Sequence, residues 1–385
     1  LTLTKGTLNT NGQTVTCGTF SSSNTNVRIL TLGASSFTSS VDWLLTTSTN
    51  LTLNANTSSI SCTGSSATFN GGGLTYNNVT LSGPNTPVVT GVNTFANLTR
   101  TGTAVKTDGL SLGANQTITG TLTINGNSVT NRVLVRSNIL GTARTITNTG
   151  ATMTWSNVDF SDITLGTAFD ASAITGNSGD ALGNTGITFT TAATQTWGGT
   201  LGGNWSTNLW TSRVPLPQDD VVISSAFSVG QTVTLDMPRA GKSIDWTGAT
   251  GTPIWAKTTA TTVYGSVTMI AGMTNSGTTS FVMEGRGAFT WTSAGQTFTN
   301  PFFIQMFGGT LTMQDAFLST AAGTFKNGTL DFNNFSSQFT TFNTSQTTTR
   351  TLTLGSGTMT LNNSAVSTLF NATIVTGLTV TATTG

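Results

Sequence analysis

The sequence predicts an all-β chain folded as a parallel β-helix, or β-solenoid, with coils of about 20 residues. Three observations lead to this prediction. Threonine dominates the composition while charge is suppressed, short apolar runs alternate with turn residues, and a motif containing asparagine recurs at a nearly constant spacing. In a β-solenoid each coil contributes short strands and rests on the coil before it, so such spacing is expected.

The composition favours strands over helices. Of 385 residues, 88 are Thr and 44 are Gly, only 7% are charged, and Glu284 is the only glutamate. Thr and Val lose side-chain freedom in a helix but pack well on a pleated strand. Disorder is the alternative for a polar chain, but it requires low hydrophobicity and usually high net charge. Here 36% of residues are hydrophobic and the mean hydropathy is +0.06, which disfavours disorder.

The repeating unit has the pattern aromatic-x-Asn-aliphatic. Clear copies are Tyr76/Asn78/Val79, Phe95/Asn97/Leu98 and Trp155/Asn157/Val158, and a weaker copy is Arg136/Asn138/Ile139. The aliphatic positions then run Val79, Leu98, Ile118, Ile139 and Val158. Stacked coils place like residues above one another, so we expect asparagine ladders in the turns, aliphatic side chains inside and threonine outside. Repeated charges at one position would oppose one another, which explains their scarcity.

An antiparallel sandwich is the competing fold. It predicts tight hairpin turns, for which the chain offers Asn11-Gly12, Asn70-Gly71, Asp108-Gly109, Asn125-Gly126 and Asn327-Gly328. These are too few for repeated hairpins in a chain of this length, so the solenoid is favoured.

A long-range recurrence supports a repetitive architecture. Gly6 returns as Gly328, 322 positions later, and the match continues without a gap to Gly33 and Gly355. The matched residues between them are Thr7, Leu8, Asn11, Phe20, Thr25, Arg28, Leu30, Thr31 and Leu32. The chain begins at Leu1 rather than Met, which predicts either processing or a fragment of a larger protein.

A change in composition divides the chain. Residues 191–225 hold three tryptophans, a Pro pair and an Asp pair, and Pro interrupts a ladder because it cannot donate a hydrogen bond. We expect a solenoid segment over residues 1–190, a connector or cap over 191–225, and a second solenoid segment over 226–385. Phe and Met are more frequent in the second segment, which predicts a larger or flatter core.

The tryptophans of the connector are the only candidate binding residues. Trp197, Trp205 and Trp210 are predicted either to stack against sugar rings or to plug the open end of a solenoid. The plug is the favoured interpretation, because an uncapped end exposes core and unpaired strand edges.

The carboxylates give no catalytic residue. Asp219 and Asp220 are adjacent, and on a strand adjacent side chains point to opposite faces, so a polar turn is favoured over a calcium ligand or an acid/base pair. The densest acidic region is formed by Asp159, Asp162, Asp170 and Asp180. Glycosidases use paired carboxylates, but solvated loop positions are the favoured interpretation.

Charge and cysteine content exclude several other functions. The net charge of +1 gives no field for nucleic acid, and Arg132, Arg136 and Arg144 are interpreted as scattered solvated charges. Without His, and with Cys17 and Cys62 expected to be free buried thiols, no metal site is predicted. No apolar run is long enough to span a membrane, and no cofactor motif is present.

The connector and its neighbours carry a family resemblance. The motif N-W-S-x-x-x-W followed by V-P-x-x-x-D-D-V-x-I, with "RVLVRSNILGTARTI", "MTWSNVDFSDIT" and "MPRAGKSIDWTGATG", resembles segments of repetitive β-solenoid tail and fibre-like proteins of tailed bacteriophages and of related bacterial surface adhesins. The likeness spans most of residues 74 to 300.

The resemblance implies a function that is mechanical and adhesive. We expect a non-enzymatic structural segment of a virion tail fibre or tail-associated protein, located on the virion surface or outside the cell. A bacterial adhesin of the same fold and a phage polysaccharide depolymerase are the alternatives. The implied partners are other copies of the chain, other appendage proteins and host surface glycans, with neither nucleic acid nor membrane insertion.

Overall fold

The computed structural model describes residues 1–363 and 365–382. Throughout this described part the regular elements are β-strands, stacked in parallel as a β-solenoid of about 16 turns. The predicted parallel β-helix is therefore confirmed, and the antiparallel sandwich is wrong. An isolated antiparallel bridge joins Trp197 and Trp210.

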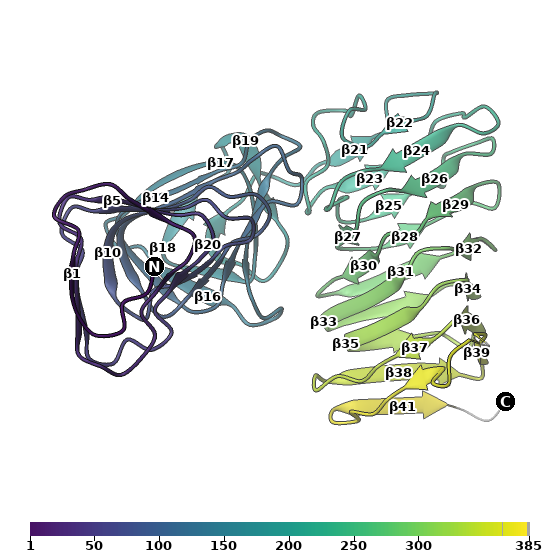
Figure 1. Cartoon of the computed structure of the whole chain (residues 1–385). Coiled ribbons are helices and arrows are strands. Elements are labelled where there is room, and N and C mark those ends of the chain that lie inside the picture. The colour runs from purple at the N-terminus through teal and green to yellow at the C-terminus, as the bar shows by residue number, and fades with distance from the viewer. Residues whose placement is uncertain (364, 383–385) are drawn as a thin grey trace. The chain divides into compact units, whose positions relative to one another are not determined.

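The chain divides into two compact units, Leu1–Thr191 and Ala192–Gly385. Residues 191–225, expected to be a connector or cap, contain three strands that pair with the following coils of the second unit. They are β21 (Thr194–Thr196), β22 (Gly203–Asn204) and β23 (Asp220–Val222). This segment thus forms the first coils of the second unit. Figure 1 shows the strands of that unit layered in order from β21 to β41.

The first unit contains two sheets. The smaller sheet holds β1 (Gly6–Asn9), β4 (Arg28–Thr31) and β7 (Leu51–Asn54). The larger sheet wraps around the coils and holds β2 (Val15–Cys17), β3 (Phe20–Ser21), β5 (Ser36–Ser39), β6 (Trp43–Leu44), β8 (Ser59–Cys62), β9 (Thr68–Asn70), β10 (Thr75–Leu81), β11 (Val88–Thr90), β12 (Thr94–Thr101), β13 (Gly109–Leu112), β14 (Gln116–Asn125), β15 (Val133–Ser137), β16 (Arg144–Thr147), β17 (Thr152–Ser161), β18 (Ile163–Asp170), β19 (Thr175–Asp180) and β20 (Thr185–Thr188).

The second unit contains three sheets within its described residues. The largest holds β21, β23, β25 (Ile244–Asp245), β27 (Thr261–Val263), β28 (Val267–Thr268), β30 (Phe281–Glu284), β31 (Ala288–Thr292), β33 (Phe302–Met313), β35 (Gly323–Asp331), β37 (Phe342–Asn343), β38 (Arg350–Gly355), β40 (Phe370–Asn371) and β41 (Leu378–Ala382). The second holds β22, β24 (Thr232–Leu235), β26 (Ile254–Lys257) and β29 (Thr274–Gly277), and the third holds β32 (Thr297–Phe298), β34 (Phe317–Ser319), β36 (Ser337–Phe339) and β39 (Met359–Leu361).

The asparagine motif sets the register where coils are shortest. Asn78 pairs with Asn97, and Asn97 Nδ2 donates to Asn78 Oδ1 at 2.7 Å across 19 residues of sequence. Asn97 Oδ1 then accepts from the backbone N of Thr121, 24 residues further on. The expected stacking of asparagines is therefore present for one pair, Asn78 and Asn97, which lie within strands β10 and β12 rather than in turns.

The predicted aliphatic column is wrong beyond Leu98. Leu122, not Ile118, follows Leu98, while Ile118 lies over Phe95. Ile139 is 50% exposed and belongs to no strand. The coil lengthens there, to 31 residues between Asn125 and Ser156. A fixed period of 20 cannot follow such insertions.

Hydroxyl side chains form a column on the outside of the first unit. Thr80 pairs with Thr99 and Thr99 with Thr123. The same column extends through Thr16, Thr38, Ser61 and Thr154. Each β-branched Thr suits the pleated backbone and adds no charge to the stack. The expected outward position of Thr is therefore confirmed for this face.

Aromatic stacking fills the core of the second unit. The rings of Phe281 and Phe302 lie 6.3 Å apart and nearly parallel, at 15°. Phe302 contacts Phe317, and Phe317 contacts Phe339, at 4.9 and 5.2 Å between centroids. Each such pair adds about 1 kcal/mol beyond the burial of its area. Met and Phe recur throughout this core, as the composition indicated.

Candidate functional site

Asp219 has a structural role in the second unit. It is fully buried, and its carboxylate accepts from Arg213 at 2.6 and 2.9 Å and from the backbone N of Ala193 and Leu216. These bonds fix the Pro-containing turn that leads into β23. Asp220 is half-buried on β23 beside it. The polar turn expected before this strand is confirmed.

The four carboxylates of the densest acidic region of the sequence do different things. Asp159 is buried against Arg132 at 2.7 Å, and Asp162 is buried with Oδ2 accepting from the backbone N of Gly141. Asp180 accepts from the backbone N of Leu182 at 2.9 Å. The expectation that Asp159 and Asp162 are solvated loop carboxylates is therefore wrong. Both side chains are buried, because their carboxylate oxygens accept hydrogen bonds that hold neighbouring segments in place.

Asp170 is the exposed member of this group. Its Oδ1 accepts from the backbone N of Ser172 at 2.9 Å, and hydrogen bonds from Ser172 lower the pKa of Asp170. Among residues 1–363 and 365–382, no three Asp, Glu, Cys or His side chains gather closely enough to hold a metal ion.

Arg132 also differs from the expectation drawn from sequence. It is buried, and besides Asp159 it donates to the backbone O of Val158 and Asn177 at 2.8 and 3.0 Å. A buried guanidinium needs this many acceptors to offset its lost hydration. Arg136 is exposed, and Arg144 donates to Asn138.

The three connector tryptophans form one cluster. Their ring centroids lie 4.9 to 6.2 Å apart, and Trp210 Nε1 donates to the backbone O of Trp205 at 2.8 Å. Trp197 is 2% exposed and Trp205 is fully buried, while Trp210 is half-buried. Their faces therefore pack mainly against each other and the core, an arrangement suited to a hydrophobic plug rather than an open platform.

The cysteines are both free thiols. Cys62 is buried as expected, but Cys17 is only half-buried. Both lie in one column with Ser39 between them, so two strand spacings, about 10 Å, separate them. This separation is too large for a disulfide.

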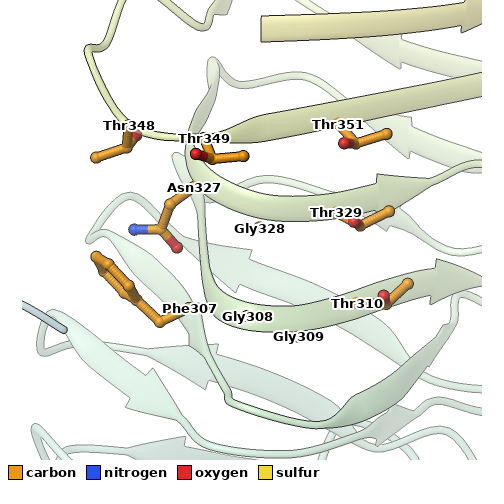
Figure 2. Close-up of a pocket in the computed structure, with 10 residues that line it drawn as sticks. All are labelled: Phe307, Gly308, Gly309, Thr310, Asn327, Gly328, Thr329, Thr348, Thr349 and Thr351. Carbon is orange, nitrogen blue, oxygen red and sulfur yellow. The ribbon is translucent and has the colours of Figure 1, made fainter. Parts of the chain in front are cut away.

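A pocket on the second unit was not predicted from the sequence. It has a volume of about 380 Å³ and is lined by Phe307, Gly308, Gly309, Thr310, Asn327, Gly328, Thr329, Thr348, Thr349 and Thr351. We call it the Phe307 pocket. Its residues come from β33, β35, β38 and the turn that leads into β38 (Figure 2).

A bulge in β33 creates the pocket. Gln305 pairs with Asn327 and Thr310 pairs with Thr329, so the four residues from Met306 to Gly309 lie opposite Gly328 alone. The excess backbone turns outward at Gly308, whose φ is +68°. Side chains alternate between the core and the outer face from Phe302 to Phe307, so Phe307 lies on the outer face by this alternation. The bulge then reverses the alternation, so that Gly309 is buried and Thr310 faces outward.

The lining side chains form two columns, one on either side of the glycines. Thr310, Thr329 and Thr351 lie one above another on adjacent strands in Figure 2, and Phe307, Asn327 and Thr348 form the second column. Asn327 is 5% exposed and its Oδ1 is buried without a hydrogen-bond partner among the described residues. An unpaired buried oxygen is unfavourable and can accept from a ligand.

Two charged residues, Arg286 and Lys326, lie close to the pocket but are not among its lining residues. The Arg286 guanidinium lies 5.8 Å from the centre of the Phe307 ring, and Lys326 Nζ lies 5.3 Å from the ring of Phe303. Such cation–π contacts hold the rings in place. The ten lining residues themselves are uncharged.

Part of this site had a signal in the sequence. Asn327-Gly328 is one of the dipeptides that an antiparallel sandwich would use as a tight turn, but it lies inside β35, where Gly328 faces the bulge. A Cβ at Gly328 would meet Met306 O at 1.8 Å, so only glycine fits. The adjacent Gly308-Gly309 pair was the other available signal.

No helix among the described residues is long and apolar enough to cross a membrane. Comparisons of the chain with protein-family models, with curated proteins and with solved structures find no match.

Proposed function

We propose that the chain is a non-enzymatic structural and adhesive segment of an extracellular appendage, such as a virion tail fibre or tail-associated protein. In this role stacked coils form a stiff support, and their threonine-rich outer faces and the Phe307 pocket make contacts with a host surface. The partners would be further copies of the chain, other appendage proteins and surface glycans. A bacterial adhesin of the same fold would work in the same way.

One observation carries the proposal: several carboxylates that could serve as catalytic acids or bases are instead engaged in buried ion pairs and in hydrogen bonds that hold turns. Asp159 and Asp219 are buried in ion pairs and backbone hydrogen bonds, and Arg100 pairs with Asp108 at 3.6 Å inside the first unit. Broken buried pairs of this kind cost about 3 kcal/mol or more. Buried ion pairs of this strength keep the turns of the solenoid rigid, and a spacer must be rigid.

Electron microscopy tests the location. Antibodies raised against residues 1–385 are expected to label tail or surface appendages on intact particles or cells. Labelling confined to the cell interior would contradict the proposal.

A degradation assay tests the non-enzymatic role against the depolymerase alternative. The chain is incubated with host capsule or lipopolysaccharide, and we expect no released oligosaccharide. Release that disappears in Asp162→Ala or Asp220→Ala would overturn the proposal. Asp170→Ala, at an exposed carboxylate, is the control.

A further inference from the structure

We propose that the Phe307 pocket binds one ring of a neutral saccharide. The proposal names a ligand class for the second unit, and it rests on the adhesive role above only for its biological setting. Three features carry it: a half-buried aromatic ring on the outer face, an unpaired amide oxygen and a column of threonine hydroxyls.

The size of the pocket suits a small ligand. Its volume of about 380 Å³ lies within the range of small-molecule sites, roughly 300–1,000 Å³. The floor is backbone at Gly308, Gly309 and Gly328, where the absence of side chains lets a ligand approach closely. A Cβ at Gly309 would lie 2.5 Å from Gly287 O, so this floor is held by the fold.

Phe307 provides the apolar surface. It is half-buried, and Figure 2 shows its ring at the edge of the pocket below Asn327. The C–H face of a pyranose ring is apolar and packs on an aromatic face. Arg286 lies near the ring and restrains it, which reduces the ordering cost of binding.

Asn327 and the threonines provide the polar contacts. The Oδ1 of Asn327, which has no partner among the described residues, can accept a hydrogen bond, and the Nδ2 of the same amide is a donor group. A sugar hydroxyl can both donate and accept a hydrogen bond. Of two neighbouring sugar hydroxyls, one can therefore donate to the amide oxygen while the other accepts from the amide nitrogen. Thr310, Thr329 and Thr351, which form the other column in Figure 2, add three hydroxyl groups to the lining.

The charge of the pocket selects a neutral ligand. The ten lining residues include neither acid nor base, and the nearby cations of Arg286 and Lys326 lie against the rings of Phe307 and Phe303. A carboxylate or phosphate would therefore lose its hydration without gaining a direct counter-charge from the lining. A neutral hydroxyl-rich ring has no such cost. We therefore expect hexose oligomers to bind more tightly than uronate oligomers of equal length.

The test uses saturation-transfer NMR and calorimetry with the full chain. The probes are cellotriose, maltotriose, mannotriose and chitotriose, with trigalacturonate as the charged comparator. We expect at least one neutral trisaccharide to bind and to receive saturation from aromatic protons. Absence of binding by all four at millimolar concentration, or tighter binding of trigalacturonate, would overturn the proposal.

Matched variants locate the site. Phe307→Ala and Asn327→Ala are expected to raise Kd by about tenfold or more. Phe303→Ala is the control, because Phe303 is a half-buried ring on the same strand that contacts Lys326 but lies outside the pocket. Equal loss in Phe303→Ala, or unchanged binding in Phe307→Ala, would contradict the assignment.

A second pair separates binding from folding. Thr329→Val keeps the β-branched shape and removes one lining hydroxyl, and Thr312→Val makes the same change on β33 outside the pocket. Thermal unfolding of both is expected to match the parent. A weakened affinity in Thr329→Val alone supports the proposal, and unchanged affinity in Thr329→Val contradicts the role of the threonine hydroxyls.

Discussion

Arg28 and Arg350 occupy the same place in equivalent coils of the two units. Each guanidinium is fully buried, and each donates at 3.0 Å to the hydroxyl of the residue six positions earlier, Ser22 or Thr344. Each also donates to backbone carbonyls of the next coil. The 322-residue recurrence therefore repeats a way of fixing a turn, in which one arginine satisfies several carbonyls that the turn leaves unpaired.

The same recurrence pairs a glycine with each arginine. Gly6 is stacked on Arg28 and Gly328 on Arg350, with φ values of +82° and +80°. Within each unit, the matched glycine and the matched arginine are therefore partners on adjacent strands. This relationship provides matched variants for measuring what a coil contributes.

Replacing Arg350 by Leu is expected to lower the free energy of unfolding by about 3 kcal/mol, because the carbonyls it satisfies stay buried. Arg28→Leu is expected to have a similar effect in the first unit. Urea unfolding followed by tryptophan fluorescence measures both. Arg136→Leu, at an exposed position, is the control and should change stability by no more than about 0.5 kcal/mol. An equal change in the free energy of unfolding for all three variants would contradict the stabilising role of the buried arginine contacts.

Gly6→Ala and Gly328→Ala separate backbone strain from close approach. Both place Ala at positive φ, which costs about 1 kcal/mol. At Gly6 a Cβ meets nothing within 4 Å, whereas at Gly328 it meets Met306 O. Thermal unfolding should therefore show a small loss for Gly6→Ala and a loss of about 3 kcal/mol or more for Gly328→Ala. Equal losses of stability in the two variants would show that the bulge at Met306 shifts to accommodate the added Cβ at little cost.

Lys257 should make stability depend on pH. It is buried between the rings of Trp255 and Phe298, and burial lowers the pKa of Lys257 well below its ordinary value. The unfolded chain then binds more protons than the folded chain, so the free energy of unfolding rises as pH increases from the folded pKa toward the unfolded value near 10.4.

Lys257→Met should flatten this dependence and raise stability at neutral pH. Urea unfolding between about pH 6 and pH 7.5 measures it, about one pH unit or more below the pKa of an unfolded cysteine. Lys5→Met, at an exposed lysine, should retain the slope of the parent. A slope that survives in Lys257→Met would contradict the assignment.

The two thiols should react at different rates. Burial raises the pKa of Cys62 to about 12, and Cys62 is inaccessible, whereas Cys17 is half-buried. Since the thiolate is the reactive form, we expect Cys17 to be labelled by a thiol reagent at least about ten times faster than Cys62. Cys17→Ser isolates the slow thiol, and urea should equalise the rates. Rapid native labelling of Cys62 would show that the first core opens readily.

The sequence predicted the coil where the motif is regular. Tyr76 pairs with Phe95 and Asn78 with Asn97, as their spacing indicated. The prediction failed where insertions lengthen the coil, because Ile118 then moves into the aromatic column and Ile139 leaves the stack. Periodicity reports stacking only between coils of equal length.

Buried polar residues were the harder part of the prediction. Arg132 and Asp159 were both interpreted as solvated, yet they pair inside the first unit. Unlike Arg28 and Arg350, these two residues belong to no recurrence that the sequence shows, so neither composition nor periodicity reveals that they pair. The Phe307 pocket was missed for a related reason: it depends on three additional residues in β33, and an aromatic next to Gly-Gly does not by itself indicate a bulge.

Distances along the threonine column of the first unit test the parallel stack most directly. Spin labels at Thr16 and Thr99, in a chain with Cys17→Ser and Cys62→Ser, are four strands apart, and labels at Thr16 and Thr154 are six strands apart. At about 4.8 Å per strand, pulsed electron paramagnetic resonance should give backbone separations of about 19 and 29 Å. Separations that fail to grow in proportion to the number of coils would contradict the stacked solenoid.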